Sequence, residues 1–443
     1  MSFDVSFTKD ECSDVKWWRG RKVAVWGAGL SGVSAAKLLH RLGAEVTLSD
    51  PQPIEALPLT QDLPKEMKTS FGVPNELNEA EVLIPSPGLK PSHPLIQRAI
   101  ASQVQIMSEI ELGARLTQAK LIAVTGTDGK STTTRLIEEA IKAQGLWVRS
   151  VGNIGDPLCN WALDAPNDGF FALEISAFQL WSTHYLGAEV GVVTNIAEDH
   201  LDYFDGSSIA YRDAKLKLAE LLKIGGKLFY PSERFTADEI ERERLIRNQS
   251  IEWVSYERPH EEIESPLIGE HNQLNLSAAI GVTCSLGLRQ ELAREAFKTF
   301  APLPYRMTLS RTLRGVRYVN DSKATNVHAS LSGINSVKES LIVITGGYDK
   351  GLDHEPLIEA LRNRARCVFC IGQTGPQLHQ ALSEKGVRSE DVRTLEHAVI
   401  AASENAKEGE MVLFSPAASS FDQFKNFEER GAIFDSLVSR LTV

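Results

Sequence analysis

The sequence predicts an α/β protein, in which helices cover mainly parallel sheets. Three observations predict this class. Short apolar runs rich in β-branched residues alternate with helical stretches along the whole chain. Glycine-rich turns join a predicted strand to a predicted helix at two places, as in doubly wound sheets. With 443 residues, the chain is long enough for about three domains.

The first predicted element group is a βαβ unit close to the amino terminus. A strand over Lys22–Trp26 leads into a tight turn, Gly27–Gly32, and a helix over Val33–Leu42 follows. The second strand, Glu45–Leu48, ends just before Asp50. This unit predicts a Rossmann-like amino-terminal domain.

Two further series of strands divide the rest of the chain. The second series is Leu121–Thr125, Trp147–Val151, Phe170–Leu173, Val190–Thr194 and Lys227–Tyr230. The third series follows a proline-bearing segment and is Arg317–Asn320, Leu341–Thr345, Cys367–Ile371 and Met411–Phe414. We therefore expect three domains, over residues 1–108, 109–302 and 303–443.

Composition and charge exclude several classes of protein. Hydrophobic residues make up 42% of the chain and charged residues 24%, so wholesale disorder is not expected. A formal net charge of −11 argues against a general nucleic-acid binder, although it allows a local phosphate site. The first residues form no apolar signal segment, and no apolar run reaches the roughly eighteen residues of a membrane span. We expect a cytoplasmic protein without membrane insertion.

A cysteine pair resembles part of a zinc site and a charged stretch resembles a binding patch, but the surrounding sequence argues against both functions. Cys367 and Cys370 have the spacing of half a zinc site, but they lie in an apolar run without a second pair, so we expect buried strand cysteines. The five cysteines are scattered, which favours a reducing compartment over a disulfide framework. The stretch Asp238–Arg247 mixes charges of both signs, and we expect a solvated helix face without a function.

The first glycine-rich turn could bind a nucleotide-like ligand. Gly27–Gly32 follows a strand and opens a helix, so a diphosphate could approach the backbone N–H groups at the helix N-terminus. Asp50 stands where an acid could meet a ribose hydroxyl. A turn that serves only the packing of helix on strand would need the same glycines, so both interpretations stay open.

The second glycine-rich turn predicts a more specific chemistry. In Thr125–Thr132 a lysine and then a hydroxyl follow a glycine at a strand–helix junction, which is the arrangement of a P-loop. Lys130 would neutralise the β- and γ-phosphate oxygens of a nucleotide, and Ser131 would help to hold Mg²⁺. The strict pattern requires glycine where this chain has Val124, so the loop is a variant with its glycine at Gly126. We expect a central P-loop domain that binds ATP.

Two side chains beyond the P-loop could complete a metal site. Glu174 ends one apolar strand, and His200 follows another. The carboxyl ends of parallel strands meet at one edge of a sheet, so both side chains could converge on the metal of the P-loop. A carboxylate suits Mg²⁺ well, whereas His200 could equally be a structural histidine.

A set of segments spread over most of the chain matches one known pattern. The set is Thr125–Thr132, Gly152–Gly155, Glu174 with Ser176, Glu198–His200, Tyr211–Lys215 and Gly269–Asn275. It resembles the motifs of the Mur ligases of bacterial cell-wall synthesis and of their folylpolyglutamate synthase relatives, which form amide bonds with ATP. The resemblance implies a domain that holds UDP, a central ATPase domain and a last, Rossmann-like domain that holds the incoming amino acid.

Two segments of the third domain indicate a branch of this family. Asn320–Asn326 and Ser415–Phe427, the latter followed by Glu429–Gly431, are similar to the signatures of the branch that adds D-glutamate. The resemblance implies a monomeric enzyme of cytoplasmic peptidoglycan precursor synthesis. This enzyme would add D-glutamate to UDP-N-acetylmuramoyl-L-alanine through an acyl phosphate.

The resemblance also implies roles for individual residues. Contacts with ATP are expected from Gly126, Thr127, Asp128, Gly129, Lys130, Ser131, Thr132, Asn272, Asn275, Arg306, Asp321 and Lys323. Contacts with the substrates are expected from Gly29, Leu30, Ser31, Asp50, Ser86, Asn153, Ser176, Gln179 and Phe421, and with the amino acid from Thr325, Lys350, Ser420 and Phe427. Magnesium, in two ions, would be held by Ser131, Glu174, His200 and Lys215, and the catalytic residues would be Lys130, His200 and Lys215. Lys215 would act as a metal ligand because CO₂ converts it to a carbamate anion.

The chain departs from the family's pattern at a few positions. Asp128 replaces the usual asparagine of the P-loop, Tyr305 replaces a histidine, and Pro51 and Gln52 replace a Thr-Arg pair seen in some relatives. The first departure places an additional carboxylate near the phosphates.

Other functions remain as alternatives. A related ligase could use L-glutamate or another amino acid, since the sequence does not specify the hand of the acceptor. In a different class, the first turn could bind NAD in an oxidoreductase, although no catalytic acid–base group accompanies it. A regulatory P-loop ATPase is a further alternative, and it would hydrolyse ATP without stimulation by an amine.

Overall fold

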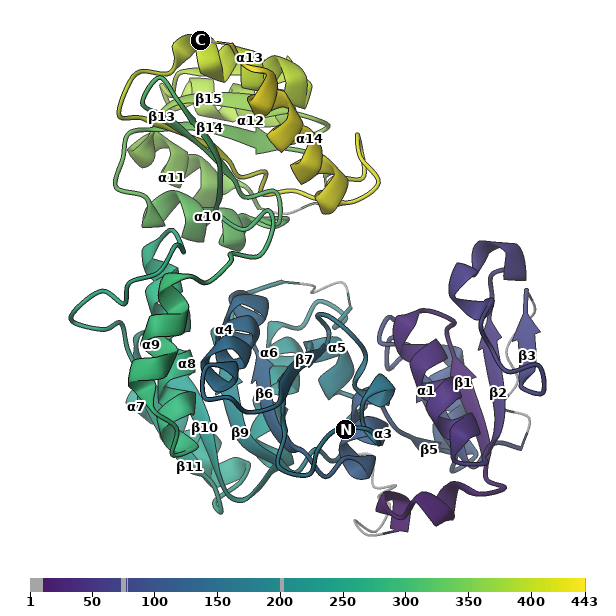
Figure 1. The fold of residues 1–443 in the computed structure, drawn as a ribbon. Helices are drawn as coiled ribbons and strands as arrows, with labels where there is room; N and C mark the ends of the chain where they lie inside the picture. Colours follow the sequence, from purple (N-terminus) through teal and green to yellow (C-terminus); the bar gives the residue numbers. More distant parts are fainter. Residues whose placement is uncertain are drawn as a thin grey trace. The chain divides into compact units, whose positions relative to one another are not determined.

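The computed structural model describes residues 11–72, 77, 79–199, 203–349, 351 and 353–442. It is an α/β protein with three separate sheets, as the sequence predicts (Figure 1). The chain forms two compact units, Met1–Arg258 with Asn275–Ala296, and Pro259–Leu274 with Phe297–Val443. None of the described helices combines the length and the apolar content that crossing a bilayer requires.

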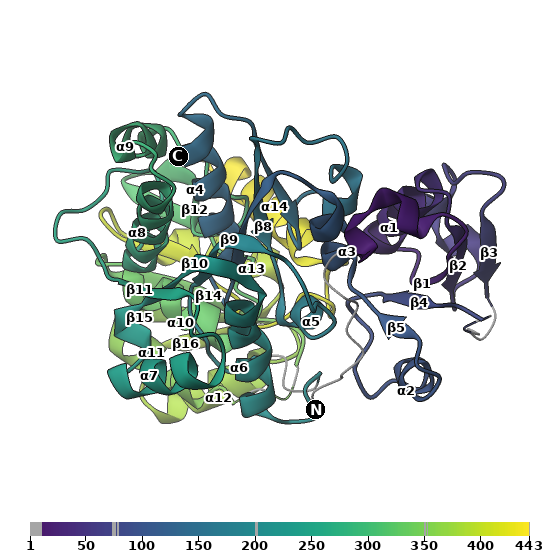
Figure 2. The ribbon, with the colours of Figure 1, turned by 90° about the horizontal axis from the view of Figure 1, so that it is seen from below.

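The first sheet has the strand order β3-β2-β1-β4-β5, and all its strands are parallel. Its strands are β1 (Lys22–Trp26), β2 (Glu45–Asp50), β3 (Lys68–Phe71), β4 (Val82–Pro85) and β5 (Gln105–Ile106). Helices α1 (Leu30–Arg41) and α2 (Pro94–Ala101) cover opposite faces of this sheet (Figure 2). Strand order reverses between β1 and β4, so the turn after β1 lies where doubly wound sheets bind their ligands.

The second sheet, in the same unit, has the order β11-β10-β9-β6-β8-β7 and is also parallel throughout. Its strands are β6 (Lys120–Thr125), β7 (Val148–Gly152), β8 (Phe170–Glu174), β9 (Ala188–Val193), β10 (Leu222–Pro231) and β11 (Glu252–Tyr256). The helices of this part of the chain are α3 (Glu109–Leu116), α4 (Lys130–Lys142), α5 (Ala177–Leu180), α6 (Ser208–Leu216), α7 (Ala237–Ile246), α8 (Glu270–Ser285) and α9 (Gln290–Lys298). Strand β6 lies between β9 and β8, so the three loops that follow these strands meet at one edge.

The third sheet has the order β12-β13-β17-β14-β15-β16. Its strands are β12 (Thr308–Leu313), β13 (Val316–Asn320), β14 (Leu341–Gly346), β15 (Ala365–Ile371), β16 (Ser389–Arg393) and β17 (Met411–Phe414). Helices α10 (Val327–Ser336), α11 (Glu355–Arg364) and α12 (Gly375–Glu384) pack on one face, and α13 (Leu395–Asn405) and α14 (Phe427–Arg440) pack on the other. The central strands are buried on both faces, which explains their uninterrupted apolar sequences.

Strands β3, β4, β5, β11, β12 and β16 were not predicted, and helix α1 begins earlier than predicted. Helix α1 begins at Leu30 and not at Val33, because Gly32 lacks a Cβ: an added Cβ would lie 1.8 Å from the carbonyl oxygen of Gly27. The glycine therefore lets the helix start directly after the strand. The antiparallel pair of β12 and β13 was not predicted, since the hairpin between them lies outside the expected parallel pattern.

Both cysteines of the apparent half zinc site behave as predicted. Cys367 and Cys370 are buried within β15, with side chains in the apolar layers on the two faces of the third sheet. Successive strand positions alternate between faces, so residues three apart point to opposite sides and cannot share one metal ion there.

Candidate active site

The loop between β6 and α4 has the backbone geometry that the P-loop pattern predicts. Gly126 and Gly129 both adopt positive φ, 144° and 79°, where a side chain would be strained. A Cβ on Gly126 would lie 1.9 Å from Thr194 Oγ1, and one on Gly129 would lie 2.6 Å from Asn275 Oδ1. The glycines are therefore required by the conformation of the loop and by its close neighbours.

Two lysines hold the carbonyl groups of this loop. Lys130 Nζ donates to the carbonyl of Thr127 at 2.7 Å, and Lys215 Nζ donates to the carbonyl of Gly126 at 2.6 Å. Ser131 and Thr132 follow in the first turn of α4, where backbone N–H groups have no partner within the helix. The loop thus combines two lysine amines with a helix N-terminus, which is an arrangement suited to phosphate.

Glu174 ends β8 beside the P-loop strand and is only 2% exposed. Its Oε1 accepts a hydrogen bond from Asn153 Nδ2 at 2.8 Å, whereas its Oε2 is buried and has no hydrogen-bond partner among the described residues. A buried carboxylate oxygen without a partner is costly unless a cation or a donor binds it. Glu174 is therefore suited to a metal ion, and Asn153 orients the carboxylate.

Lys215 lies on α6 and is 2% exposed, an unusual location for a lysine. Its amine lies 4.5 Å from the centre of the Tyr211 ring. Burial, and secondarily the charge of Lys130, lowers the pKa of Lys215 well below its usual value, although Asp199, Asp128 and Glu174 act in the opposite direction. The structure thus brings Lys215, Lys130 and Glu174 to one site, where burial disfavours the charged form of the Lys215 amine.

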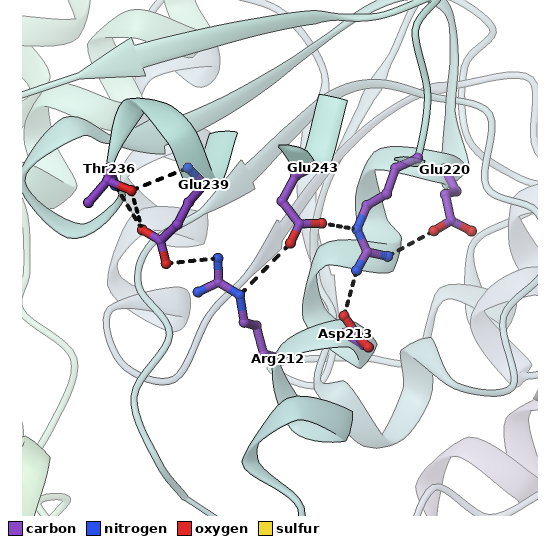
Figure 3. Close-up of polar contacts among 7 residues, drawn as sticks. Arg212, Asp213, Glu220, Thr236, Glu239 and Glu243 are labelled. Atoms are coloured by element: carbon purple, nitrogen blue, oxygen red, sulfur yellow. Dashed lines mark hydrogen bonds and ion pairs between the residues drawn. The ribbon is translucent and has the colours of Figure 1, made fainter. Parts of the chain in front are cut away.

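Helix α6 is fixed in place by a network of ion pairs with α7 (Figure 3). The side chain of Arg247 is 8% exposed, and its guanidinium bonds Asp213 at 2.8 Å, Glu220 at 2.9 Å and Glu243 at 2.6 Å. Arg212, on α6, pairs with Glu239 and Glu243, which both lie on α7. The expectation of a solvated face without a role is therefore wrong for its carboxyl-terminal end, because these charges brace the helix that carries Lys215.

The remaining residues expected around this loop are also close to it or close to Glu174. Asn275 accepts a hydrogen bond from Thr133 Oγ1 of α4 at 3.2 Å. Ser176 and Gln179 are buried at the start of α5, directly after β8, where Gln179 Oε1 accepts from the backbone N–H and the hydroxyl of Ser176. These bonds fix the loop that follows Glu174.

The first glycine-rich turn is built differently. A Cβ on Gly27 would lie 2.7 Å from Ser86 Cβ, so this glycine permits the close approach of the loop after β4. Asp50 accepts hydrogen bonds from the backbone N–H of Ala28 at 2.8 Å and of Gln52 at 2.9 Å. The acid therefore supports the turn itself. Gly29 and Leu30 lie at the exposed start of α1, followed by Ser31.

The second unit contains the other expected nucleotide and amino-acid residues. Asp321 follows β13 and is held by Ser415 Oγ, which donates to its Oδ2 at 2.9 Å. The Lys323 amine lies 3.9 Å from the centre of the Phe427 ring, at the start of α14. The remaining members in this unit are Asn272, Arg306, Thr325, Ser420 and Phe421. His200 and Lys350 lie outside the described residues.

Arg430 lies in the Glu429–Gly431 motif, and the sequence predicted no role for it. In the structure it organises this part of the second unit. It is 1% exposed and donates to the carbonyls of Ala418, Ser419 and Ser322 and to the Ser322 hydroxyl. Burial lowers its pKa to about 10, so it remains charged at neutral pH. Arg430 therefore ties together the loops after β13 and β17. The role of Arg430 becomes evident only from its burial in the structure.

Comparison with known proteins identifies the family of the chain. Residues 21–108 match the Mur ligase MurD-like, N-terminal domain, residues 124–244 the Mur ligase middle domain, and residues 305–418 the Mur ligase, glutamate ligase domain. A Salmonella typhi protein named UDP-N-acetylmuramoylalanine–D-glutamate ligase is 35% identical over 442 residues, which cover 96% of this chain and 99% of that protein. A protein of the same name from Acinetobacter baylyi is 34% identical over 452 residues, with 96% and 99% covered.

Solved structures share the fold at lower identity. The crystal structure of MurF from Acinetobacter baumannii matches with a TM-score of 0.60 at 14% identity, covering 96% of this chain and 92% of that one. That of UDP-N-acetylmuramate-alanine ligase MurC from Thermotoga maritima gives 0.59 at 17% identity, with 95% and 99% covered. The sequence matches extend over nearly the whole chain and include the P-loop, Glu174 and Lys215. The chain belongs to the Mur ligase family.

Proposed function

We propose that this protein is an ATP-dependent ligase that adds D-glutamate to UDP-N-acetylmuramoyl-L-alanine. The observation that carries this proposal is the similarity to proteins named for that reaction, at 32–35% identity over 94–96% of the chain. The glycine-rich loop with Lys130, the buried Glu174 and the buried Lys215 support an ATP-dependent reaction. We propose three domains with boundaries near residues 108 and 302.

The chemistry explains why such an enzyme needs ATP. A carboxylate does not react with an amine at neutral pH, because its carbon is a poor electrophile and oxide a poor leaving group. Transfer of the γ-phosphoryl group of ATP to the carboxylate of the L-alanyl residue would give an acyl phosphate and ADP. The amine of D-glutamate would then attack the acyl carbon and release phosphate. Lys130 would stabilise the negative charge that gathers on the transferred phosphoryl group.

The residues present fit magnesium. The buried Oε2 of Glu174 has no hydrogen-bond partner within the part of the chain that the structure describes, and oxygen is the ligand that Mg²⁺ prefers. Ser131, Glu174, His200 and a modified Lys215 would together hold the two ions. When bound, Mg²⁺ neutralises phosphate oxygens and orients the transferred group. Asn153 keeps the Glu174 carboxylate in place for this role.

The surroundings of Lys215 support a proposed carbamate on its amine. Its side chain is buried within 4.5 Å of a tyrosine ring centre, beside a second lysine whose charge opposes protonation. A neutral amine is the form that attacks CO₂. The carbamate formed would be an anion that could bind a cation, in agreement with the neighbouring Glu174 carboxylate. We propose this modification as part of the active enzyme.

The acceptor pocket would lie in the second unit. Ser420 and Phe427, with Thr325, Phe421 and Lys350, would contact the amino acid, and Lys350 would pair with a carboxylate. Asp321, Lys323, Arg306 and Asn272 would contact ATP. The UDP group would bind at the turn after β1, through Gly29, Leu30, Ser31, Asp50 and Ser86. We further propose that the enzyme works as a monomer in the cytoplasm.

One assay tests the proposed function directly. Phosphate release is measured with ATP, Mg²⁺, UDP-N-acetylmuramoyl-L-alanine and a panel of amino acids of both hands. We expect release that depends on all components and is greatest with D-glutamate. Faster release with L-glutamate or another amino acid would contradict the proposed acceptor. Release that no amine accelerates would favour a regulatory ATPase, and NADH oxidation with a 2-oxo acid would favour an oxidoreductase.

A further inference from the structure

Residues 194, 195 and 197, in the segment that follows β9, bond to the P-loop. Asn195 Oδ1 accepts hydrogen bonds from the backbone N–H groups of Thr127, at 3.0 Å, and Asp128, at 2.9 Å. The backbone carbonyl of Asn195 also accepts from the N–H of Thr127, at 3.0 Å. One asparagine therefore binds two consecutive peptide groups of the loop. Because both neighbours are donors, the amide oxygen and not the amide nitrogen must face the loop.

Further contacts of the same segment complete this attachment. Thr194 Oγ1 donates to the carbonyls of Asp128 and Thr125. The backbone N–H of Ala197 donates to Thr127 Oγ1 at 3.0 Å, and that hydroxyl also lies 3.2 Å from Tyr211 OH on α6. With the two lysine bonds to Thr127 and Gly126, the carbonyls of residues 126–128 all accept a hydrogen bond from a side chain.

The pattern of these bonds has a consequence for phosphate binding. The backbone N–H groups of residues 127 and 128 already donate to Asn195, so the orientation of these peptide groups is fixed. The N–H groups that follow open helix α4, where the first turn lacks partners within the helix and faces its N-terminus. A loop fixed in this way binds phosphate without losing conformational freedom on binding.

We propose that Asn195 is a positioning residue of the phosphate site, which holds the P-loop in the conformation that binds the β- and γ-phosphates. The inference rests on the proposed function, because it takes ATP as the ligand of this loop. Asn195 acts through the backbone of the loop and need not touch the nucleotide. Its removal should therefore weaken binding of the terminal phosphates more than binding of the nucleoside.

The experiment compares Asn195→Ala with a matched control, Asn248→Ala. Asn248 Oδ1 also accepts from a backbone N–H, that of Ser250 at 3.0 Å, but in a turn outside the P-loop. Affinities for ADP and for AMP are measured by isothermal titration in the presence of Mg²⁺. We expect Asn195→Ala to weaken ADP binding about tenfold and AMP binding less than about twofold, and Asn248→Ala to change neither.

A folded Asn195→Ala variant that binds ADP as tightly as the unchanged protein would overturn the proposal, and so would equal losses for ADP and AMP. If Asn195→Ala does not fold, Asn195→Ser is tested in its place, since its shorter side chain cannot reach both N–H groups. Hydrogen–deuterium exchange of the loop gives a second readout, with faster exchange expected only in the Asn195 variants. Unchanged loop exchange would contradict the proposal. Exchange needs no nucleotide, so it distinguishes failure of this inference from failure of the proposed function.

Discussion

The two glycine-rich turns, Gly27–Gly32 and Gly126–Lys130, look alike in sequence and differ in what surrounds them. Both join a parallel strand to a helix at the point where strand order reverses. Around the first turn, Asp50 accepts from the backbone and Ser86 lies close to Gly27. Around the second, Lys130, Lys215 and Asn195 bond to the loop. The second turn therefore owes part of its chemistry to Lys215 and Asn195, which are distant from it in sequence.

The largest effect is expected from Lys130→Ala, which removes a charge that only the second turn possesses. We expect phosphate release to fall at least about a hundredfold, because the lysine stabilises the transferred phosphoryl group. The fold should be retained, since the side chain serves no apolar core. Activity is measured together with thermal unfolding. Unchanged turnover in a folded variant would mean that Lys130 gives the second turn no catalytic role that the first turn lacks.

Lys215→Ala tests the contribution of α6 to the second turn. We expect loss of nearly all activity, and partial recovery when a small carboxylate such as formate is added, because the added anion can occupy the position of the carbamate. Lys215→Arg should also be inactive, since a guanidinium keeps its charge and cannot form the carbamate. Depleting CO₂ should slow the unchanged enzyme, and bicarbonate should restore it. Normal turnover of Lys215→Ala would show that the lysine only supports the loop.

Gly126→Ala and Gly29→Ala form a matched pair across the two turns. Gly126 has φ 144° and no room for a Cβ, so alanine there should lower the free energy of unfolding by about 2 kcal/mol or more. Gly29 has φ −77° and no heavy atom within 4 Å of an added Cβ, so alanine should be tolerated within about 0.5 kcal/mol. Denaturant unfolding measures both.

The kinetics of Gly29→Ala add a functional readout to that pair. If a diphosphate approaches the first turn closely, this variant should raise KM for the UDP substrate and leave KM for ATP unchanged. An unchanged KM for the UDP substrate would favour a turn that serves packing alone.

The smallest effect is expected from Asp128→Asn, which restores the residue usual in the family. We expect turnover within about threefold of the unchanged enzyme, because the backbone bond from Asp128 to Asn195 is independent of the side chain. The Mg²⁺ concentration for half-maximal activity should shift, since one carboxylate near the phosphates is removed. A titration of activity against Mg²⁺ measures the shift, and complete inactivity would reveal a role that the structure does not suggest.

The sequence predicted those features that depend on a short stretch of chain. The α/β class and the P-loop follow from local patterns of apolar residues and glycines, and the structure places Glu174 and Lys215 beside that loop as expected. The start of α1 was misplaced because it depends on the distance between Gly32 and the Gly27 carbonyl, which no periodicity contains.

Asn195 and Arg430 act across long separations and were not predicted, whereas Lys215, which bonds Gly126 across 89 positions, was expected only from the family resemblance. Asn195 binds a loop 67 or 68 positions earlier in the chain, and Arg430 bonds Ser322 across 108 positions. The charges of α7 were assigned to solvent because sequence cannot show that Arg247 is partly enclosed by acids of α6 and η6 (Lys217–Leu221). Each of these roles becomes visible only when distant elements are brought together.

In the proposed reaction, ATP bound at the second turn transfers its γ-phosphoryl group to the carboxylate of the UDP substrate before the amide forms. The most direct measurement follows a heavy-oxygen label placed in that carboxylate. The account predicts that, during turnover with ATP and D-glutamate, one labelled oxygen passes from the carboxylate to the released phosphate. Phosphate released without label, while the amide product forms, would contradict the account.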